Sequence, residues 1–201
     1  FWTAELNEDI ERLQNEAYLI RENDKDGVRK SNTGFNGYHS KDIRDFNNLP
    51  GTNHLLNQII NAVNAIHQIS RQGDLLLTNF WLNISPKGSS NIPHTHSGLT
   101  YSGVFYIKVP KEIKGGRLLF YRNFNEADFI STEYMGHFKE GYQMQGYDYP
   151  INTISPKENM LVVFPAWVPH AVEINLSDEE RISLSFNFKL NRSFSRVKEE
   201  D

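Results

Sequence analysis

Three histidines are spaced so that they could bind one metal ion. His94 and His96 are separated by a single residue, and His170 follows much later, shortly after an apolar run at residues 160–164. Side chains two residues apart in an extended segment point to the same side, so His94 and His96 can present two imidazoles to one ion. His170 would supply the third ligand. In the alternative, His94 and His96 lie at the surface and hydrogen bond to their own loop.

A second pattern could bind an anion. Residues 181–187 alternate strictly between polar and apolar side chains, as a β-strand does. The polar face would carry Arg181, Ser183, Ser185 and Asn187. If this face lies in water, the segment is an ordinary strand of an antiparallel sheet. If it faces the inside of a barrel, Arg181 can pair with a carboxylate through two hydrogen bonds, helped by the Ser183 hydroxyl.

A third pattern lies between these two. Ser102, Val104 and Tyr106 share one face of a predicted strand. The phenol of Tyr106 could donate a hydrogen bond to the same anion. The alternative is a core tyrosine whose hydroxyl is satisfied within the protein.

The elements that position these residues follow from the periodicity of the apolar side chains. Apolar residues at helical spacing predict helices over residues 5–23 and 54–71, and Gly73 is expected to follow the second helix directly. Alternation and boundary residues predict strands at 75–84, 103–109, 117–121, 160–164, 171–174 and 181–190. Residues 24–50 read as a loop. His67 is expected at the surface of the second helix.

The order of elements indicates an α+β protein that is mainly β. Two helices followed only by strands predict a β-sandwich or barrel with N-terminal helices packed on one face. We expect a helical support region over residues 1–73, a barrel core over 74–190 and a charged tail over 191–201. The aromatic, glycine-rich stretch 122–157 is predicted to be an insertion, acting either as a lid or as a dimer contact.

Composition excludes several classes of function. The 201 residues carry 21 basic and 25 acidic side chains, a net charge of −4, which disfavours binding to nucleic acid. The chain contains no cysteine, which excludes disulfides, thiolate metal sites and a cysteine nucleophile. It also has no long apolar run and no signal-peptide pattern at its start, so we expect a cytoplasmic protein that does not enter a membrane.

Taken together, the motifs resemble a known superfamily. Their order is similar to that in the double-stranded β-helix (jelly-roll, cupin-like) of the Fe²⁺- and 2-oxoglutarate-dependent oxygenases, and most of all to an uncharacterised branch that is related to prolyl hydroxylases and found in marine bacteria and phages. The matching motifs are Trp81-Leu82-Asn83, His94-Thr95-His96, residues 102–106, Gly115-Gly116, residues 164–167 with His170, and residues 181–187, with Ser31-Asn32 and residues 37–40 upstream.

The resemblance implies a catalytic metal site with one departure from the usual pattern. His94 matches the first iron ligand and His170 the distal one, but His96 occupies the position usually held by a carboxylate. We expect His96 to be the third ligand. In the alternative His96 does not bind, and water, halide or a carboxylate such as Glu173 or Asp128 fills the place.

The resemblance also implies the co-substrates. Arg181 matches the residue that pairs with the far carboxylate of 2-oxoglutarate, and Ser183, Tyr106 and Ser102 are expected beside it. The amides of Asn83 and Asn187 are expected to line the pocket, or else to bridge groups within the barrel. O₂ would be the second co-substrate.

These features predict an Fe²⁺- and 2-oxoglutarate-dependent dioxygenase. It would hydroxylate a peptide or protein side chain or a small molecule, and release succinate and CO₂. One alternative is a three-histidine dioxygenase that does not use 2-oxoglutarate. Another is a non-catalytic barrel that binds a metal or a carboxylate. The sequence leaves open the substrate, a possible homodimer, and the choice between hydroxylation, halogenation and desaturation.

Overall fold

The computed structural model describes residues 1–28, 34–69, 73–121 and 151–191. Within these ranges the chain forms two helices and eleven strands. The helices are α1 (Ile10–Asn23) and α2 (Pro50–Gln68). The strands are β1 (Trp2–Glu5), β2 (Gly34–Phe35), β3 (Tyr38–His39), β4 (Leu75–Ser85), β5 (Ser90–His94), β6 (Tyr101–Lys108), β7 (Leu118–Tyr121), β8 (Ile151–Ile154), β9 (Met160–Pro165), β10 (His170–Val172) and β11 (Arg181–Leu190).

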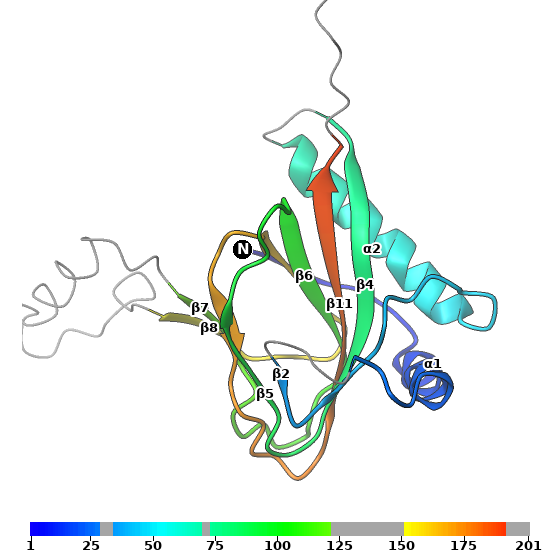
Figure 1. Ribbon diagram of the computed structural model, residues 1–201, viewed down its shortest axis with the longest axis vertical. Coiled ribbons are helices and arrows are strands. Elements are labelled where there is room, and N and C mark those ends of the chain that lie inside the picture. Colours follow the sequence, from blue (N-terminus) through cyan, green and yellow to red (C-terminus); the bar gives the residue numbers. More distant parts are fainter. Residues whose placement is uncertain (29–33, 70–72, 122–150, 192–201) are drawn as a thin grey trace, which may run out of the picture.

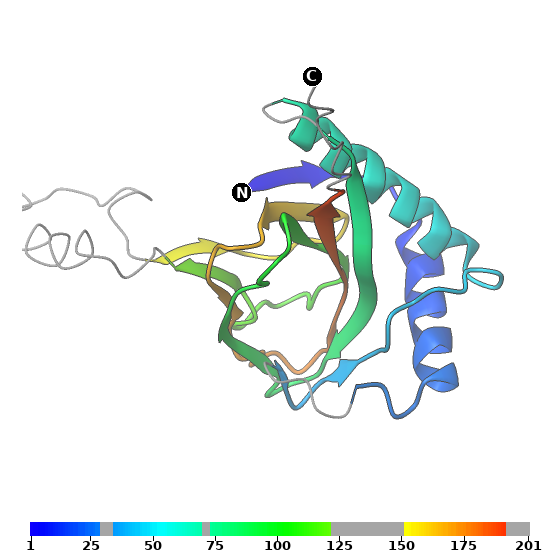
Figure 2. The same ribbon diagram turned by 45° about the horizontal axis from the view of Figure 1, so that its top comes forward.

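The strands form two antiparallel sheets that face each other as a barrel. The larger sheet has the order β1-β9-β6-β11-β4-β3, and the smaller has the order β2-β5-β10-β7-β8. Figures 1 and 2 show the two sheets facing each other, with both helices outside the larger sheet, on the side of β4. This is the mainly β, double-stranded β-helix architecture that the sequence predicts.

The two helices cover the outer face of the larger sheet. Leu13 and Ala17 of α1 and Leu55 and Ile59 of α2 are buried in one core cluster with the apolar face of the sheet. The apolar periodicity predicted this packing correctly, because three- and four-residue spacing places these side chains on one face of each helix. Neither helix is long and apolar enough to cross a membrane, within the part of the chain that the structure describes.

A buried carboxylate joins the two helices. Glu16 of α1 accepts hydrogen bonds from the backbone N–H of Gly51 at 2.8 Å and of Thr52 at 2.6 Å, and from the Thr52 hydroxyl at 2.7 Å. The first turn of a helix leaves N–H groups without intrahelical partners. Leu49, the N-cap residue of α2, offers no side-chain hydrogen bond, so Glu16 provides the cap from another helix.

The helix boundaries differ from the predicted ones. The first helix begins at Ile10 because Asp9 caps it, accepting a hydrogen bond from the backbone N–H of Arg12 at 3.1 Å. Residues 2–5, further upstream, form β1, which pairs with β9 at the edge of the larger sheet. The second helix begins at Pro50 and ends at Gln68, so Gly73 does not directly follow it.

Several short strands were not predicted. The loop assigned to residues 24–50 contains β2 and β3, which add one strand to each sheet. The support region over residues 1–73 is therefore not purely helical. Residues 151–154 of the predicted insertion form β8, which pairs with β7, whereas residues 122–150 lie outside the described residues.

The strand β11 sits between β6 and β4 and presents its polar face to the inside of the barrel. Its apolar face, including Ile182 and Leu184, is buried in the core beneath the helices. The barrel interpretation of the alternating segment 181–187 is therefore confirmed.

The neighbouring strand β6 needs a glycine at Gly103, because a Cβ there would lie 2.2 Å from Cζ of Phe186 and 2.5 Å from the carbonyl oxygen of Val162.

Candidate functional site

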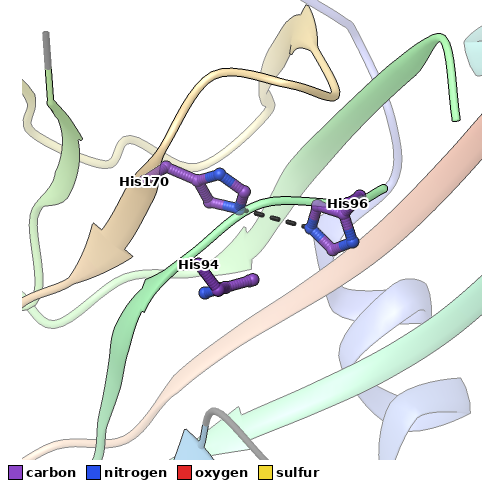
Figure 3. Close-up of side chains that lie close together, drawn as sticks. All are labelled: His94, His96 and His170. Atoms are coloured by element: carbon purple, nitrogen blue, oxygen red, sulfur yellow. Dashed lines mark hydrogen bonds between the residues drawn. The ribbon is translucent and has the colours of Figure 1, made fainter. Parts of the chain in front are cut away.

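The three histidines come together on the smaller sheet. His94 ends β5 and His170 begins β10, and the two residues are direct partners in the antiparallel pairing of these strands. His96 lies in the loop after β5, where its backbone N–H donates to the carbonyl oxygen of Ala166 at 2.9 Å. One ring nitrogen from each histidine lies within 4.8 Å of the other two. Figure 3 shows the three rings converging from β5, β10 and the loop.

Two of the rings have a fixed tautomer. Nδ1 of His94 lies 2.8 Å from the carbonyl oxygen of Ile92, and Nδ1 of His170 lies 2.9 Å from that of Val168. A carbonyl oxygen can only accept, so both Nδ1 atoms carry the hydrogen. In the neutral form of each ring, Nε2 therefore carries the lone pair that a metal ligand requires.

Burial keeps two of the three rings uncharged. It lowers the pKa of His96 to about 4, with a smaller contribution from the charge of His94. It also lowers the pKa of His170 to about 3, again with smaller contributions from the neighbouring histidines. Both rings are neutral at pH 7, which is the form that binds a metal.

The spacing of the nitrogens suits one shared ion. Nε2 of His96 lies 3.3 Å from Nε2 of His170, the contact dashed in Figure 3. Two nitrogens bound to one ion at about 2.1 Å, with an angle between about 90° and 110°, lie roughly 3.0 to 3.4 Å apart. The donor set therefore fits a divalent metal, although the assignment of each histidine as a ligand remains a prediction.

The alternative carboxylate ligands gain no support. Both carboxylate oxygens of Glu173 accept hydrogen bonds from Arg117, at 2.7 Å from Nε and 2.6 Å from Nη2. This ion pair lowers the pKa of Glu173. Asp128 lies outside the described residues.

Arg181 lies on the opposite wall, at the start of β11. Its side chain is buried, with Nη1 donating to the carbonyl oxygen of Gly116 at 2.5 Å and Nη2 to the Ser85 hydroxyl at 3.4 Å. Gly115 and Gly116 both adopt positive φ, which glycine tolerates best. This turn brings the Gly116 carbonyl to the guanidinium.

The guanidinium lacks a counter-charge among the described residues. No carboxylate there lies within ion-pair distance of it, and its Nε is buried without a hydrogen-bond partner. Burial lowers the pKa of Arg181, although an arginine stays charged in a protein. A buried cation with an unpaired donor is destabilising by itself, so the site fits a carboxylate ligand.

One cavity of about 310 Å³ joins the histidines to Arg181. Ser183, Tyr106, Ser102 and Asn83 line it as the sequence analysis expected of them. The Tyr106 ring centroid lies 6.0 Å from the Arg181 guanidinium carbon.

Asn187 does not line the cavity. It is buried and accepts a hydrogen bond from the Ser102 hydroxyl at 2.7 Å, which is the bridging role weighed as its alternative.

Sequence reasoning gave no role to His39, which lines this cavity, and misplaced His67. His39 of β3 lines the cavity and stacks on Trp81 of β4, with ring centroids 5.4 Å apart and an interplanar angle of 13°. Only its place in the motif at residues 37–40 pointed to it, since spacing alone gives no reason to bring it beside His94. His67, expected at the surface, is buried against Tyr101, with ring centroids 5.9 Å apart.

Comparison with known families and proteins gave one family match. Residues 79–187 match the family described as putative 2OG-Fe(II) oxygenase, where 2OG is 2-oxoglutarate, and this segment covers more than half of the chain. It contains the three histidines, Arg181 and the lining residues of β4, β6 and β11. No curated protein matches the chain.

Solved structures share the fold at low sequence identity. A Pseudomonas putida prolyl-4-hydroxylase is 18% identical with a TM-score of 0.61, and the match covers 94% of this chain and 91% of that one. A viral collagen prolyl hydroxylase from Paramecium Bursaria Chlorella virus-1, solved with 2-oxoglutarate, is 11% identical with a TM-score of 0.59, covering 94% and 96%. A 2OG-Fe(II) oxygenase family oxidoreductase from Burkholderia pseudomallei is 16% identical with a TM-score of 0.53, covering 76% and 66%.

Proposed function

Because this chain belongs to the putative 2OG-Fe(II) oxygenase family, we propose that it is an Fe²⁺- and 2-oxoglutarate-dependent dioxygenase. It hydroxylates a substrate and converts 2-oxoglutarate to succinate and CO₂. The observation that carries the proposal is the shared cavity, in which three histidine imidazoles face a buried guanidinium that lacks a carboxylate partner among the described residues.

The histidines would hold the metal. His94, His96 and His170 would each offer one ring nitrogen to a shared divalent ion beside the cavity. When bound, the iron supplies the redox centre at which O₂ and 2-oxoglutarate react. Three imidazoles leave the site with the full charge of the ion, whereas a carboxylate in place of His96 would reduce it by one.

Arg181 would bind the co-substrate. Its unpaired Nε and its charge match the far carboxylate of 2-oxoglutarate, and the buried Ser183 hydroxyl lies two residues further along the same face of β11. Tyr106 of β6 lies opposite Ser183 in the pairing of β6 with β11, and it also lines the cavity beside Arg181. Leu118 and Phe164 line the cavity as apolar walls, which limit the access of water to the reacting groups.

The three-histidine dioxygenase that works without 2-oxoglutarate is less well supported. It would explain the three histidines, but it would not account for the buried Arg181 guanidinium. Similar structures of prolyl hydroxylases favour the side chain of a peptide or protein as the oxidised group, with a small molecule as the other option.

Succinate formation tests the proposal. Protein loaded with Fe²⁺ is incubated with 2-oxoglutarate and O₂, and succinate is measured. We expect wild type to form succinate, and Arg181→Ala and Arg181→Gln to form at least tenfold less while they still bind Zn²⁺. Lys189→Ala removes an exposed cation from the same strand and is expected to behave as wild type. No succinate from wild type, or equal rates in the Arg181 variants, would contradict the proposal.

A further inference from the structure

We infer that the cavity wall formed by Trp81, Asn83 and Ser185 binds an uncharged amide group of the substrate, either a carboxamide or a peptide bond. This inference rests on the proposed function, since it names the substrate class of the same cavity. His39 supports the wall from β3, next to β4. The three residues of the wall all line the cavity.

The Trp81 and Ser185 part of the wall lies further along the sheet than Arg181 and Ser183, which would hold the co-substrate. Pairing of β11 with β4 places Arg181 opposite Ser85, Ser183 opposite Asn83 and Ser185 opposite Trp81. At about 3.4 Å per residue, Ser185 lies roughly 14 Å along the strand from Arg181. The five-carbon chain of 2-oxoglutarate spans only about 5 Å between its terminal carbons at ordinary bond lengths. A co-substrate held at Arg181 therefore leaves the layer of Trp81 and Ser185 to the substrate.

The hydrogen-bonding groups of the wall complement an amide. Nδ2 of Asn83 donates to the Ser185 hydroxyl oxygen at 2.9 Å. That leaves the Ser185 hydroxyl hydrogen to donate and Oδ1 of Asn83 to accept, and no described residue satisfies either. If the Asn83 amide were turned over, the free groups would again be one donor and one acceptor. A planar amide, with its carbonyl oxygen and N–H side by side, matches this pair.

The aromatic part of the wall suits a flat group. The Trp81 indole is held on one side by the nearly parallel His39 ring. His39 is itself fixed, because its Nδ1 lies 2.7 Å from the carbonyl oxygen of Ser40. The rigid indole offers a flat apolar surface next to the Asn83 and Ser185 pair. A planar amide can stack on that surface while it forms its hydrogen bonds.

The charges of the cavity disfavour an ionised substrate group. Among the described residues that line it, none is Asp, Glu or Lys, and the wall residues Trp81, Asn83 and Ser185 carry no charge. A carboxylate or an ammonium group bound at this wall would lose its hydration without gaining an oppositely charged partner among these three side chains. A neutral group avoids this cost.

Small matched probes test the inference. Protein is loaded with Zn²⁺ and 2-oxoglutarate, and binding of 2-oxoglutarate is measured first by calorimetry. Propionamide, N-methylacetamide, propionate and propylammonium are then titrated, and their affinities are measured by NMR. We expect both amides to bind at least fivefold more tightly than propionate or propylammonium. Asn83→Ala and Ser185→Ala should each weaken amide binding by about threefold to tenfold, the value of one hydrogen bond.

Control variants separate the possible outcomes. Asn79→Ala, on the same strand but bonded to Asp42 outside the cavity, should bind the amides as wild type does. The Ser185 variant, whose residue lies four positions along β11 from Arg181, should bind 2-oxoglutarate within twofold of wild type. The inference is overturned if 2-oxoglutarate binds but the amides do not, if the charged probes bind as tightly as the amides, or if Asn83→Ala has no effect. Failure of 2-oxoglutarate itself to bind would overturn the proposed function as well.

Discussion

At the scale of single residues, the three histidines differ in how firmly they are held. His94 and His170 each donate Nδ1–H to a carbonyl oxygen two residues earlier in the chain. His96 is positioned instead through its backbone bond to Ala166 and by its contact with His170. A ring held by a local hydrogen bond is oriented for a metal before the metal arrives, so His96 is the ligand whose contribution needs a direct test.

Substitution of His96 tests its role as the third ligand. His96→Ala removes one of three donors, and we expect Zn²⁺ affinity to fall by more than about tenfold, since even loss of a partner outside the ligand set costs that much. His96→Asp restores a donor and should recover most of the affinity. Competition with a chromophoric chelator measures both. Unchanged affinity in His96→Ala would remove His96 from the metal site.

The residues of the site were largely predictable because each belongs to a short sequence pattern. His-x-His and Arg-x-Ser place like side chains on one face of a strand, and this local geometry survives in the fold. Spacing also places Ser185 on the polar face of its strand, whereas His39 gains its importance from the pairing of β3 with β4. Those two strands are distant in the chain, so no spacing in the sequence identifies His39.

At the scale of secondary structure, one buried side chain organises the helical layer. Glu16 caps the first turn of α2 with three hydrogen bonds, and it also forms an ion pair with Arg12 at 3.3 Å. The α2 helix in turn covers β4 and β11, the strands that carry Trp81 and Arg181. The cap therefore supports the wall of the cavity indirectly, through the packing of α2.

Neutralising Glu16 should destabilise the protein. Glu16→Gln keeps the shape but offers a weaker acceptor and places an extra donor among N–H groups, so we expect a loss of about 1–3 kcal/mol in the free energy of unfolding. Urea denaturation measures the change. Glu22→Gln, an exposed position on the same helix, is the matched control and should lie within about 0.5 kcal/mol of wild type. Equal stability of both variants would contradict the capping role.

Periodicity located the long elements but missed several of the short strands. Both helices and the strands β4, β6, β9 and β11 carry enough apolar side chains to reveal their period. The strands β1, β5 and β8 are short, and their register depends on partners elsewhere in the chain. In β5, Pro93 and polar neighbours also hide the strand that presents His94.

At the scale of the whole molecule, the two sheets divide the chemistry between them. The smaller sheet and its adjoining loop supply His94, His96 and His170, and the larger sheet supplies Arg181 and the Asn83 wall. The cavity exists only where the sheets face each other, so its geometry depends on the closed barrel. The overall architecture was predictable from the order of elements, whereas this division depends on the strand order within each sheet.

The metal-free protein should lose stability in mild acid. Burial lowers the pKa of His39, His96 and His170 below the ordinary value near 6.5. The unfolded chain therefore binds more protons below about pH 6.5, and the free energy of unfolding falls as pH decreases from 7.5 to 5.5. His170 alone should account for about 1 kcal/mol between pH 6.5 and 5.5.

Urea denaturation of chelator-treated protein at several pH values measures this effect. His170→Asn should show a smaller loss between pH 7.5 and 5.5 than wild type. His54→Asn changes a histidine that lies outside the cavity, with 63% of its side chain exposed, and should keep a loss close to that of wild type. The same loss in His170→Asn and wild type would show that His170 is not held neutral by the fold.

The central claim is that the three histidines and Arg181 form one site for iron and 2-oxoglutarate, and an anaerobic titration tests it most directly. Protein loaded with Fe²⁺ is titrated with 2-oxoglutarate under nitrogen while its visible absorption is recorded. We predict a weak charge-transfer band that saturates with one equivalent of 2-oxoglutarate in wild type and does not appear at that concentration in Arg181→Ala. A protein that binds Fe²⁺ but gives no band, or gives the same band without Arg181, would contradict the claim.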